Sequence, residues 1–190
     1  VIAIDFGTSY SGYCFCLASG TDQIRQVYWG AEHGLKTPKT PTSILFNHKQ
    51  EFEYFGYDAV MKYKSLPSSQ ADSWYFFQNF KMQLYNTNVT AAMKLKATNG
   101  KLLPALTVFS ESLRFMKEHA LNTIKEASSQ TVYDPEEITW VITVPAIWSA
   151  AAKQFTRLAA KEAGIISSML SRNLIIALEP EAASLWCKQL

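Results

Sequence analysis

Five residues near the start of the chain could form a phosphate-binding turn. An acidic residue, a glycine and three consecutive hydroxyl residues follow one another closely: Asp5, Gly7, Thr8, Ser9 and Tyr10. Glycine permits a sharp turn, and such a turn can gather N–H groups and hydroxyls into a concavity that binds phosphate oxygens. A carboxylate at its edge suits hydrated Mg²⁺, which takes few protein ligands. The same residues also fit an ordinary hairpin turn with solvated hydroxyls, and spacing alone favours that simpler interpretation.

Basic residues form the second group of candidate functional residues. Lys81 directly follows the aromatic-rich run 74–80, which indicates core packing more than a stacking platform. A lone lysine at such a place usually extends to the surface along its aliphatic stem. Lys153, Arg157 and Lys161 recur every four residues, which predicts the solvent-facing stripe of a helix.

Composition indicates a folded protein and argues against several classes of partner. The 190 residues are 48% hydrophobic and 18% charged, which provides for a packed core and argues against disorder. A net charge of +2 argues against nucleic acid, and no apolar run approaches the length that crosses a membrane. The cysteines Cys14, Cys16 and Cys187 are odd in number and lie in apolar context. We therefore expect buried free thiols, a reducing compartment and a cytoplasmic location.

The elements that must position these residues can be expected from periodicity and turn signals. Strands are predicted over residues 1–4, 12–18, 23–29, 43–46, 51–54, 138–144 and 173–178. The first is an unbroken apolar run, which is typical of a strand buried on both faces. A turn is expected at 19–22, and a hairpin joins 87–97 to 101–103 across Asn99-Gly100. Helices are predicted over residues 57–63, 74–83, 104–128, 149–163 and 179–190.

Two of these helices carry clear positional signals. The longest begins at Pro104, a residue favoured at a first helical position. Its apolar residues recur at spacings of three or four and define one buried face: Phe109, Leu113, Met116, Ala120 and Ile124. In the next helix, Ser149 is a suitable N-cap and Gly164 a suitable stop.

The order of elements predicts the fold class and a division into two parts. Strands at the start, followed by helix, strand, helix, strand and helix, indicate an α/β fold with helices on the faces of a mixed sheet. Residues 1–42 and 104–190 would form this core. Residues 43–103 would form an inserted, smaller α+β subdomain.

Four segments spread along the chain share a recognisable pattern. They are residues 5–9 (DFGTS), 40–44 (TPTSI), 144–146 (VPA) and 179–183 (EPEAA). Together they resemble the actin-like ATPase superfamily, which has a ribonuclease H-like core and includes actin, sugar kinases and the 70 kDa heat shock chaperones. The sequence around these segments is most similar to the divergent heat shock 70 kDa protein 12 branch of those chaperones. The resemblance implies that the chain is the N-terminal lobe of a nucleotide-binding domain.

The resemblance also implies roles around the first turn. Asp5 would hold Mg²⁺ through water. Gly7, Thr8, Ser9 and Tyr10 would contact the phosphates of ATP or ADP, with Thr8 nearest the γ-phosphate. Water would then attack the γ-phosphate in line, and charge neutralisation and positioning would lower the barrier.

Four further residues receive roles from the same resemblance. Lys81 would orient the attacking water, and Glu179 would lie near the metal and the water. Pro145 and Lys153 would relay the nucleotide state to a substrate domain. Lys153 stands where the chaperones have arginine, so it keeps the charge but loses the bidentate fork.

Three other departures from the family pattern are visible. Ser9 replaces a threonine, which is a mild change. Leu178 replaces an asparagine, and Glu181 replaces a threonine beside the inferred site. The Glu181 charge would repel phosphate if it pointed inward and would have no effect on the helix exterior.

The resemblance covers only half of a nucleotide cleft. In this superfamily the nucleotide lies between two lobes, and the DxGGGT loop of the second lobe does not occur here. Because both ends of the chain fall inside expected elements, we expect a piece of a longer protein. On its own it should bind ATP with millimolar affinity at best and hydrolyse it negligibly. Its partners would be ATP, the second lobe, and client or co-chaperone proteins.

Three functions fit these features. The first is the ATPase lobe of a chaperone-like protein involved in stress response. The second is a degenerate scaffold in which ATP only sets the conformation. The third is a sugar-kinase relative, which would need a base aspartate and a transferable hydroxyl group in the cleft. The VPA and EPEAA segments argue against the third.

Overall fold

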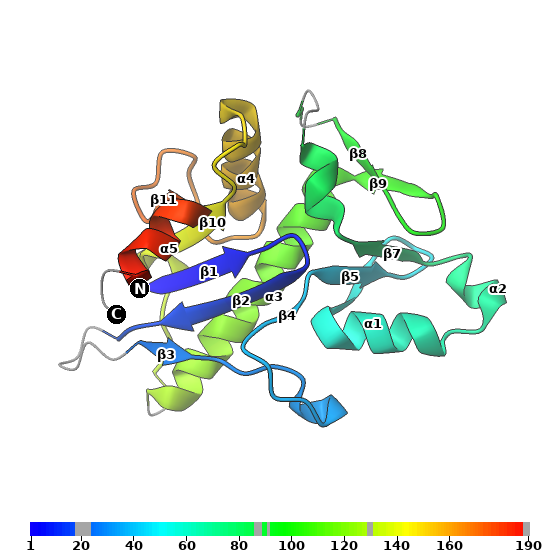
Figure 1. Cartoon of the computed structure of the whole chain (residues 1–190), viewed down its shortest axis with the longest axis horizontal. Helices are drawn as coiled ribbons and strands as arrows, with labels where there is room; N and C mark the ends of the chain where they lie inside the picture. Colours follow the sequence, from blue (N-terminus) through cyan, green and yellow to red (C-terminus); the bar gives the residue numbers. More distant parts are fainter. Residues whose placement is uncertain (18–23, 86–88, 91, 129–130, 188–190) are drawn as a thin grey trace.

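The computed structural model describes residues 1–17, 24–85, 89–90, 92–128 and 131–187. The turn predicted at 19–22 and part of the strand predicted at 87–97 lie outside these residues. The chain forms a mixed sheet flanked by helices and two smaller antiparallel sheets (Figure 1). The α/β class expected from the order of elements is therefore confirmed.

The larger sheet contains three parallel strands and three further strands. Its strands are β1 (Ile2–Phe6), β2 (Tyr10–Phe15), β3 (Arg25–Gln26), β4 (Thr40–Pro41), β10 (Trp140–Val144) and β11 (Leu174–Leu178). Their order is β11-β10-β1-β2-β3, with β4 also paired to β2. Strands β1, β10 and β11 are parallel, whereas β2 runs antiparallel to β1. The carboxyl ends of the parallel strands therefore meet at one edge of the sheet.

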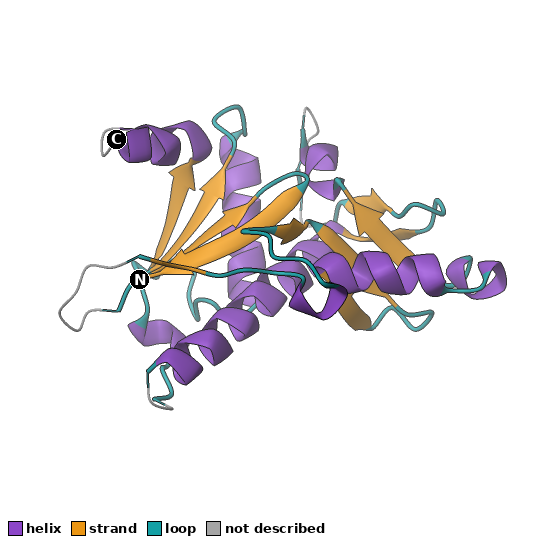
Figure 2. Cartoon of the chain, turned by 60° about the horizontal axis from the view of Figure 1, so that its bottom comes forward, coloured by secondary structure: helices purple, strands orange, loops and turns teal. Residues whose placement is uncertain are grey.

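Two long helices cover one face of this sheet (Figure 2). They are α3 (Ala105–Ala127) and α4 (Ala150–Glu162), which also pack against each other. The apolar face predicted for the longest helix is confirmed, since all five of its residues are buried: Phe109, Leu113, Met116, Ala120 and Ile124. The third helix, α5 (Glu179–Cys187), follows β11 without a loop.

The start and stop signals of α4 are also confirmed. The Ser149 hydroxyl accepts a hydrogen bond from the backbone N–H of Ala152, at 3.2 Å, as an N-cap does. Gly164 follows the helix with a φ of 71°, a left-handed conformation that favours glycine. Pro104 lies one position before the first residue of α3, so it serves as N-cap and not as the first helical residue.

The middle of the chain forms a second group of elements beside the main sheet. Its three-stranded sheet has the order β6-β5-β7, built from β5 (Ser43–Phe46), β6 (Phe52–Phe55) and β7 (Tyr75–Gln78). The predicted hairpin at Asn99-Gly100 is confirmed as β8 (Lys94–Lys96) and β9 (Leu102–Pro104). The helices here are α1 (Gly56–Ser65) and α2 (Ser68–Ala71), and the 3-10 helices of the chain are η1 (Ala31–His33), η2 (Phe80–Leu84) and η3 (Pro135–Glu137). One hydrophobic cluster runs through both groups.

The prediction of a helix over residues 74–83 is wrong. Residues 75–78 form β7, which pairs with β5, and residues 80–84 form η2. Between them Asn79 has a φ of 50°, which a continuous helix cannot contain. Aromatic residues pack well on a pleated surface, so pairing with β5 outweighs the helical spacing.

Other differences concern burial. Strand β1 alternates between buried and half-exposed positions, so one face is open at Ala3 and Asp5. Strand β11 is only partly buried because it forms an edge of the sheet. The strand predicted at 23–29 is limited to Arg25–Gln26, and β2 begins at Tyr10 instead of residue 12. The three cysteines are free, but Cys187 is exposed and the other two are half-buried.

Arg157 does not belong to a purely solvent-facing stripe. Its guanidinium donates to the backbone carbonyl oxygens of Met169, Ser171 and Leu174. It therefore fixes the loop that leads into β11. None of the helices in the described part of the chain is long and apolar enough to cross a membrane.

Candidate functional site

The carboxyl edge of the parallel strands brings distant residues together. Asp5 lies near the end of β1, Thr143 near the end of β10, and Glu179 begins α5 after β11. Ligands of α/β sheets commonly bind at this edge. The three residues line a cleft of about 410 Å³ together with Gly7, Thr8, Lys39, Ala182 and Ala183.

Lys81 reaches this edge from the neighbouring group of elements, and it is buried. Its side chain is 1% exposed, and its ammonium donates to the backbone carbonyl oxygen of Phe6 and, at 2.9 Å, to Oε1 of Glu179. The Lys81 nitrogen also lies 5.1 Å from the ring centre of Trp148. The expectation of a surface lysine, drawn from its residue type alone, is wrong.

The environment of Lys81 acts on its pKa in two directions. Burial lowers the pKa below the ordinary value of a lysine, whereas the hydrogen bond and charge of Glu179 and the charge of Asp5 raise it. Burial is the largest effect. The carboxylate of Glu179 therefore favours the charged form of Lys81, against the effect of burial.

The hydroxyl-rich turn after β1 requires glycine at position 7. A Cβ atom there would lie 2.2 Å from the backbone oxygen of Tyr10. The turn is held from the side by Thr42, whose N–H donates to the oxygen of Ser9 at 2.8 Å and whose hydroxyl donates to the oxygen of Gly7 at 2.9 Å. The segment 40–44 thus supports the turn directly, which explains why these two segments occur together.

Each carboxylate oxygen of Asp5 has a partner. Its Oδ1 accepts a hydrogen bond from the Thr143 hydroxyl at 2.8 Å, and its Oδ2 forms an ion pair with the ammonium of Lys39. The side chains of Asp5 and Lys39 are 42% and 45% exposed, so the pair is open to water.

This arrangement does not fit a magnesium ion at Asp5. A hydrated ion at Asp5 would lie close to the Lys39 ammonium that is paired with Oδ2, and the two positive charges would repel each other. Within the described ranges, there is also no group of three His, Cys, Asp or Glu side chains that could hold a metal. The prediction of magnesium at Asp5 took no account of Lys39, because the sequence gives no sign that this ammonium lies over Asp5.

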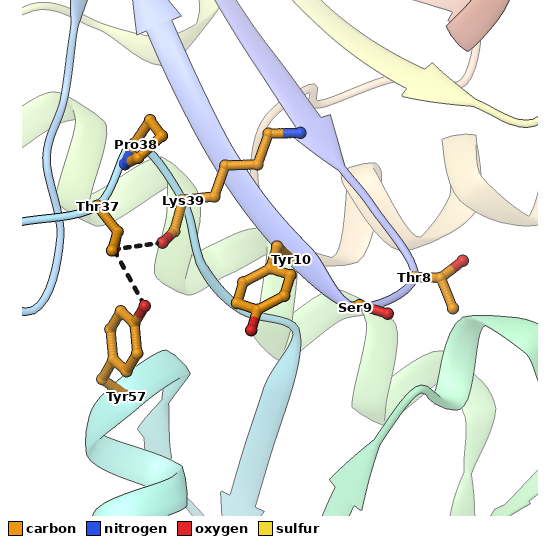
Figure 3. Close-up of a pocket in the computed structure, with 7 residues that line it drawn as sticks. All are labelled: Thr8, Ser9, Tyr10, Thr37, Pro38, Lys39 and Tyr57. Carbon is orange, nitrogen blue, oxygen red and sulfur yellow. Dashed lines mark hydrogen bonds between the residues drawn. The ribbon is translucent and has the colours of Figure 1, made fainter.

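A second hollow lies on the other side of Lys39 (Figure 3). Its volume is about 510 Å³, and five of its seven lining residues carry a hydroxyl group: Thr8, Ser9, Tyr10, Thr37, Pro38, Lys39 and Tyr57. The hydroxyls of Thr37 and Tyr57 lie 3.1 Å apart. Ser9 and Tyr10 are exposed and Thr8 is half-buried, so all three are accessible to a polar ligand, although the Ser9 hydroxyl also donates to Oδ1 of Asn79 at 3.5 Å.

The remaining predicted residues lie around this edge. Pro145 directly follows β10, and its carbonyl oxygen accepts from the N–H of Trp148 at 3.2 Å. Lys153 lies in the first turn of α4 and is not among the described residues that line the two clefts. Glu181 is exposed, whereas its neighbours Ala182 and Ala183 line the smaller cleft.

Lys39 and Thr143 are the site residues that sequence reasoning missed. Lys39 falls between two prolines, and Thr143 is one of two threonines in a β-rich run, so neither has a distinctive local pattern. The only available signal was proximity to a recognised segment, since Lys39 precedes Thr40 and Thr143 precedes Val144. Their contacts with Asp5 depend on pairing between strands far apart in the chain.

No protein-family profile matches the chain. The chain is 44% identical over 193 residues to heat shock 70 kDa protein 12B of Homo sapiens. It is 45% identical over 195 residues to heat shock 70 kDa protein 12A of Mus musculus, and 41% identical over 193 residues to the human 12A protein. Each comparison covers all of this chain but spans only 28% of the length of the relative.

Proposed function

This chain is homologous over its whole length to heat shock 70 kDa proteins 12A and 12B, and we propose that it is the phosphate-binding lobe of an ATP-binding domain with the actin-like fold. The observation that carries the proposal is the buried Lys81–Glu179 pair beside the Gly7 turn. The two residues are 98 positions apart in the sequence, and their contact beside the turn supports the proposal.

The electrostatics of this edge suit a phosphate group. The ammonium of Lys81 is held in a low-dielectric position by Glu179 and by the carbonyl oxygen of Phe6, directly before the turn. A fixed positive charge that is shielded from water stabilises developing negative charge more than a hydrated one does. The Thr8 and Ser9 hydroxyls stand on the same turn and supply neutral donors.

The proposed division of roles follows from these positions. Gly7, Thr8, Ser9 and Tyr10 contact phosphate oxygens, Lys81 positions the attacking water, and Glu179 maintains the charge of Lys81. The roles of Pro145 and Lys153 in relaying the nucleotide state remain part of the proposal. So does the division of the chain into a core of 1–42 and 104–190 with residues 43–103 inserted.

A titration of the isotope-labelled chain with ATP tests this proposal by nuclear magnetic resonance. We expect millimolar ATP to shift the amide signals of Gly7, Thr8 and Ser9, and the shifts to disappear in Lys81→Met. Lys101→Met is a matched control, because Lys101 also donates to a backbone carbonyl, that of Ser73, and lies over the ring of Tyr75. The proposal fails if ATP shifts none of these signals or if both variants respond alike.

The second candidate function is a nucleotide-dependent scaffold with little hydrolysis. The Lys39 ammonium at Asp5 favours it, because this positive charge opposes the binding of a divalent ion that would assist the reaction. Turnover of the full-length protein separates the two functions: hydrolysis that falls at least a hundredfold in Lys81→Ala supports the ATPase, since positioning groups contribute at this scale. Binding without turnover supports the scaffold. Homology to heat shock proteins argues against the sugar-kinase relative.

A further inference from the structure

Lys39 lies between all the hollows around the phosphate turn. It lines the two clefts described above and a third hollow of about 440 Å³ on the open face of the sheet. Its ammonium forms an ion pair with Oδ2 of Asp5. Neither the resemblance nor the comparisons assign this residue a function.

The path of the Lys39 side chain is built into the sheet. Asp5 of β1 pairs directly with Gly12 of β2, and the stem of Lys39 crosses β2 at this glycine. A Cβ atom on Gly12 would lie 3.2 Å from Cγ of Lys39 and 2.9 Å from the oxygen of Pro38. Figure 3 shows the side chain extended across β2 towards β1. The missing side chain at position 12 therefore opens the route to Asp5.

The backbone on both sides of Lys39 is also fixed. Before it, Thr37 pairs with Trp29 through two backbone hydrogen bonds, and the Thr37 hydroxyl donates to the oxygen of Lys39 at 2.8 Å. After it, Thr40 pairs with Ser11 as part of β4. Lys39 is thus aimed at Asp5 by the strand pairing of its neighbours.

The cleft already provides an ammonium partner for each of its carboxylates. Its two carboxylates, Asp5 and Glu179, are each paired with one ammonium, that of Lys39 or that of Lys81. Magnesium at Asp5 would add two positive charges beside the Lys39 ammonium, which lies on Oδ2 of the same carboxylate, so the two cations would compete for it.

We propose that Lys39 takes the place of a divalent cation at Asp5. The phosphates of the nucleotide then bind this lobe without a metal ion, and a divalent ion enters only by displacing Lys39. This inference rests on the proposed function, because it concerns the same phosphate turn. Since Asp5 and Lys39 are each about half exposed, water weakens their pair, and removal of the ammonium should strengthen divalent binding on the order of tenfold.

Paramagnetic Mn²⁺ alone tests the competition at Asp5, without any nucleotide. Mn²⁺ broadens amide signals near its binding site, so Phe6, Gly7 and Thr8 report on Asp5. We expect broadening in Lys39→Met at an Mn²⁺ concentration about tenfold lower than in the unaltered chain. Methionine keeps the apolar stem over Gly12 while removing the charge. Adding Asp5→Asn to this variant should abolish the increase in Mn²⁺ sensitivity.

Lys36→Met is the matched control. Lys36 lies in the same loop, and its ammonium lies 5.0 Å from the ring centre of Tyr28, not at Asp5. Its Mn²⁺ response should equal that of the unaltered chain. Equal responses in Lys39→Met and the unaltered chain, or no broadening in Lys39→Met, would overturn the proposed competition.

Tripolyphosphate tests the second half of the inference. In the unaltered chain, tripolyphosphate should shift the amide signals of Gly7 and Thr8 equally in Mg²⁺ and in EDTA. In Lys39→Met, the same shifts should require Mg²⁺. A requirement for Mg²⁺ in the unaltered chain contradicts metal-free binding. If tripolyphosphate shifts neither protein, the proposed function fails together with this second half, whereas the Mn²⁺ titration still decides whether Lys39 competes with a metal.

Discussion

Lys81 and Glu179 are unequal partners, because the lysine side chain is 1% exposed and the glutamate 39%. After Lys81→Met, the remaining carboxylate can be hydrated, so we expect the free energy of unfolding to change by less than about 1 kcal/mol. After Glu179→Gln, the ammonium stays buried without its counter-ion, so we expect a loss of about 1–3 kcal/mol. Urea denaturation at pH 7.5 measures both values.

The critical result for this pair is which of the two variants loses more free energy of unfolding. A larger loss in Lys81→Met than in Glu179→Gln would show that Lys81 contributes mainly to stability. The double variant should resemble Lys81→Met alone, because the buried charge is absent from both. Loss of ATP binding without loss of stability would then identify Lys81 as a functional residue.

At the scale of elements, the start of α4 is coupled to the site. Ser149 caps α4, and the preceding residue is Trp148, whose ring lies beneath the Lys81 ammonium. Ser149→Ala removes the acceptor of the Ala152 N–H, so we expect a loss of about 1 kcal/mol in the free energy of unfolding. Thermal or urea denaturation measures it. Ser149→Asp keeps an acceptor and should retain most of the stability; equal losses in the two variants would exclude the cap as the cause.

The packing of α3 on β2 should depend on pH through His119. Its ring stacks on Trp29 at 4.3 Å between ring centres, and Nδ1 lies 2.7 Å from the hydroxyl of Tyr13. Burial lowers the pKa of His119, although the charges of Glu32 and Glu126 partly oppose this. Below its ordinary pKa near 6.5, the unfolded chain therefore binds a proton that the folded chain does not.

The sign of the His119 effect follows from this difference. Stability should fall as the pH decreases from 6.5 through the lowered pKa, and it should be unaffected by His119 above pH 7.5. Urea denaturation at pH 7.5 and at pH 5.5 measures the change. In His119→Gln the fall should be smaller, since that variant cannot take up the proton. An equal fall in both proteins would assign the pH dependence to other groups.

At the scale of the whole molecule, the chain provides one side of the proposed nucleotide cleft. It spans 28% of the length of its relatives, and the residues proposed to contact the nucleotide, Gly7, Thr8, Ser9 and Tyr10, are assigned to its phosphates. We therefore expect a dissociation constant for ATP in the millimolar range, because contacts to the rest of the nucleotide would come from a second lobe. Isothermal titration calorimetry measures this value. Micromolar affinity would contradict the one-lobe interpretation.

Much of the fold was predictable because its signals are local. The buried stripe of α3, the Ser149 cap, the Gly164 stop and the Asn99-Gly100 hairpin each depend on a few neighbouring residues. Residues 74–83 were not predictable in the same way. Their aromatic side chains fit either a helix or a strand, and pairing with β5 decides for the strand.

For the candidate site, the sequence by itself determined the glycine turn, because position 7 has no room for a side chain. With the family resemblance, it also singled out Asp5, Lys81 and Glu179. Only the tertiary structure decided how deeply these groups are buried and which charged groups they are paired with. It buried Lys81 against Glu179 and placed Lys39 on Asp5 across Gly12. The physical reason is that a charge depends on what lies within a few ångströms in space, and strand pairing brings those neighbours from remote parts of the chain.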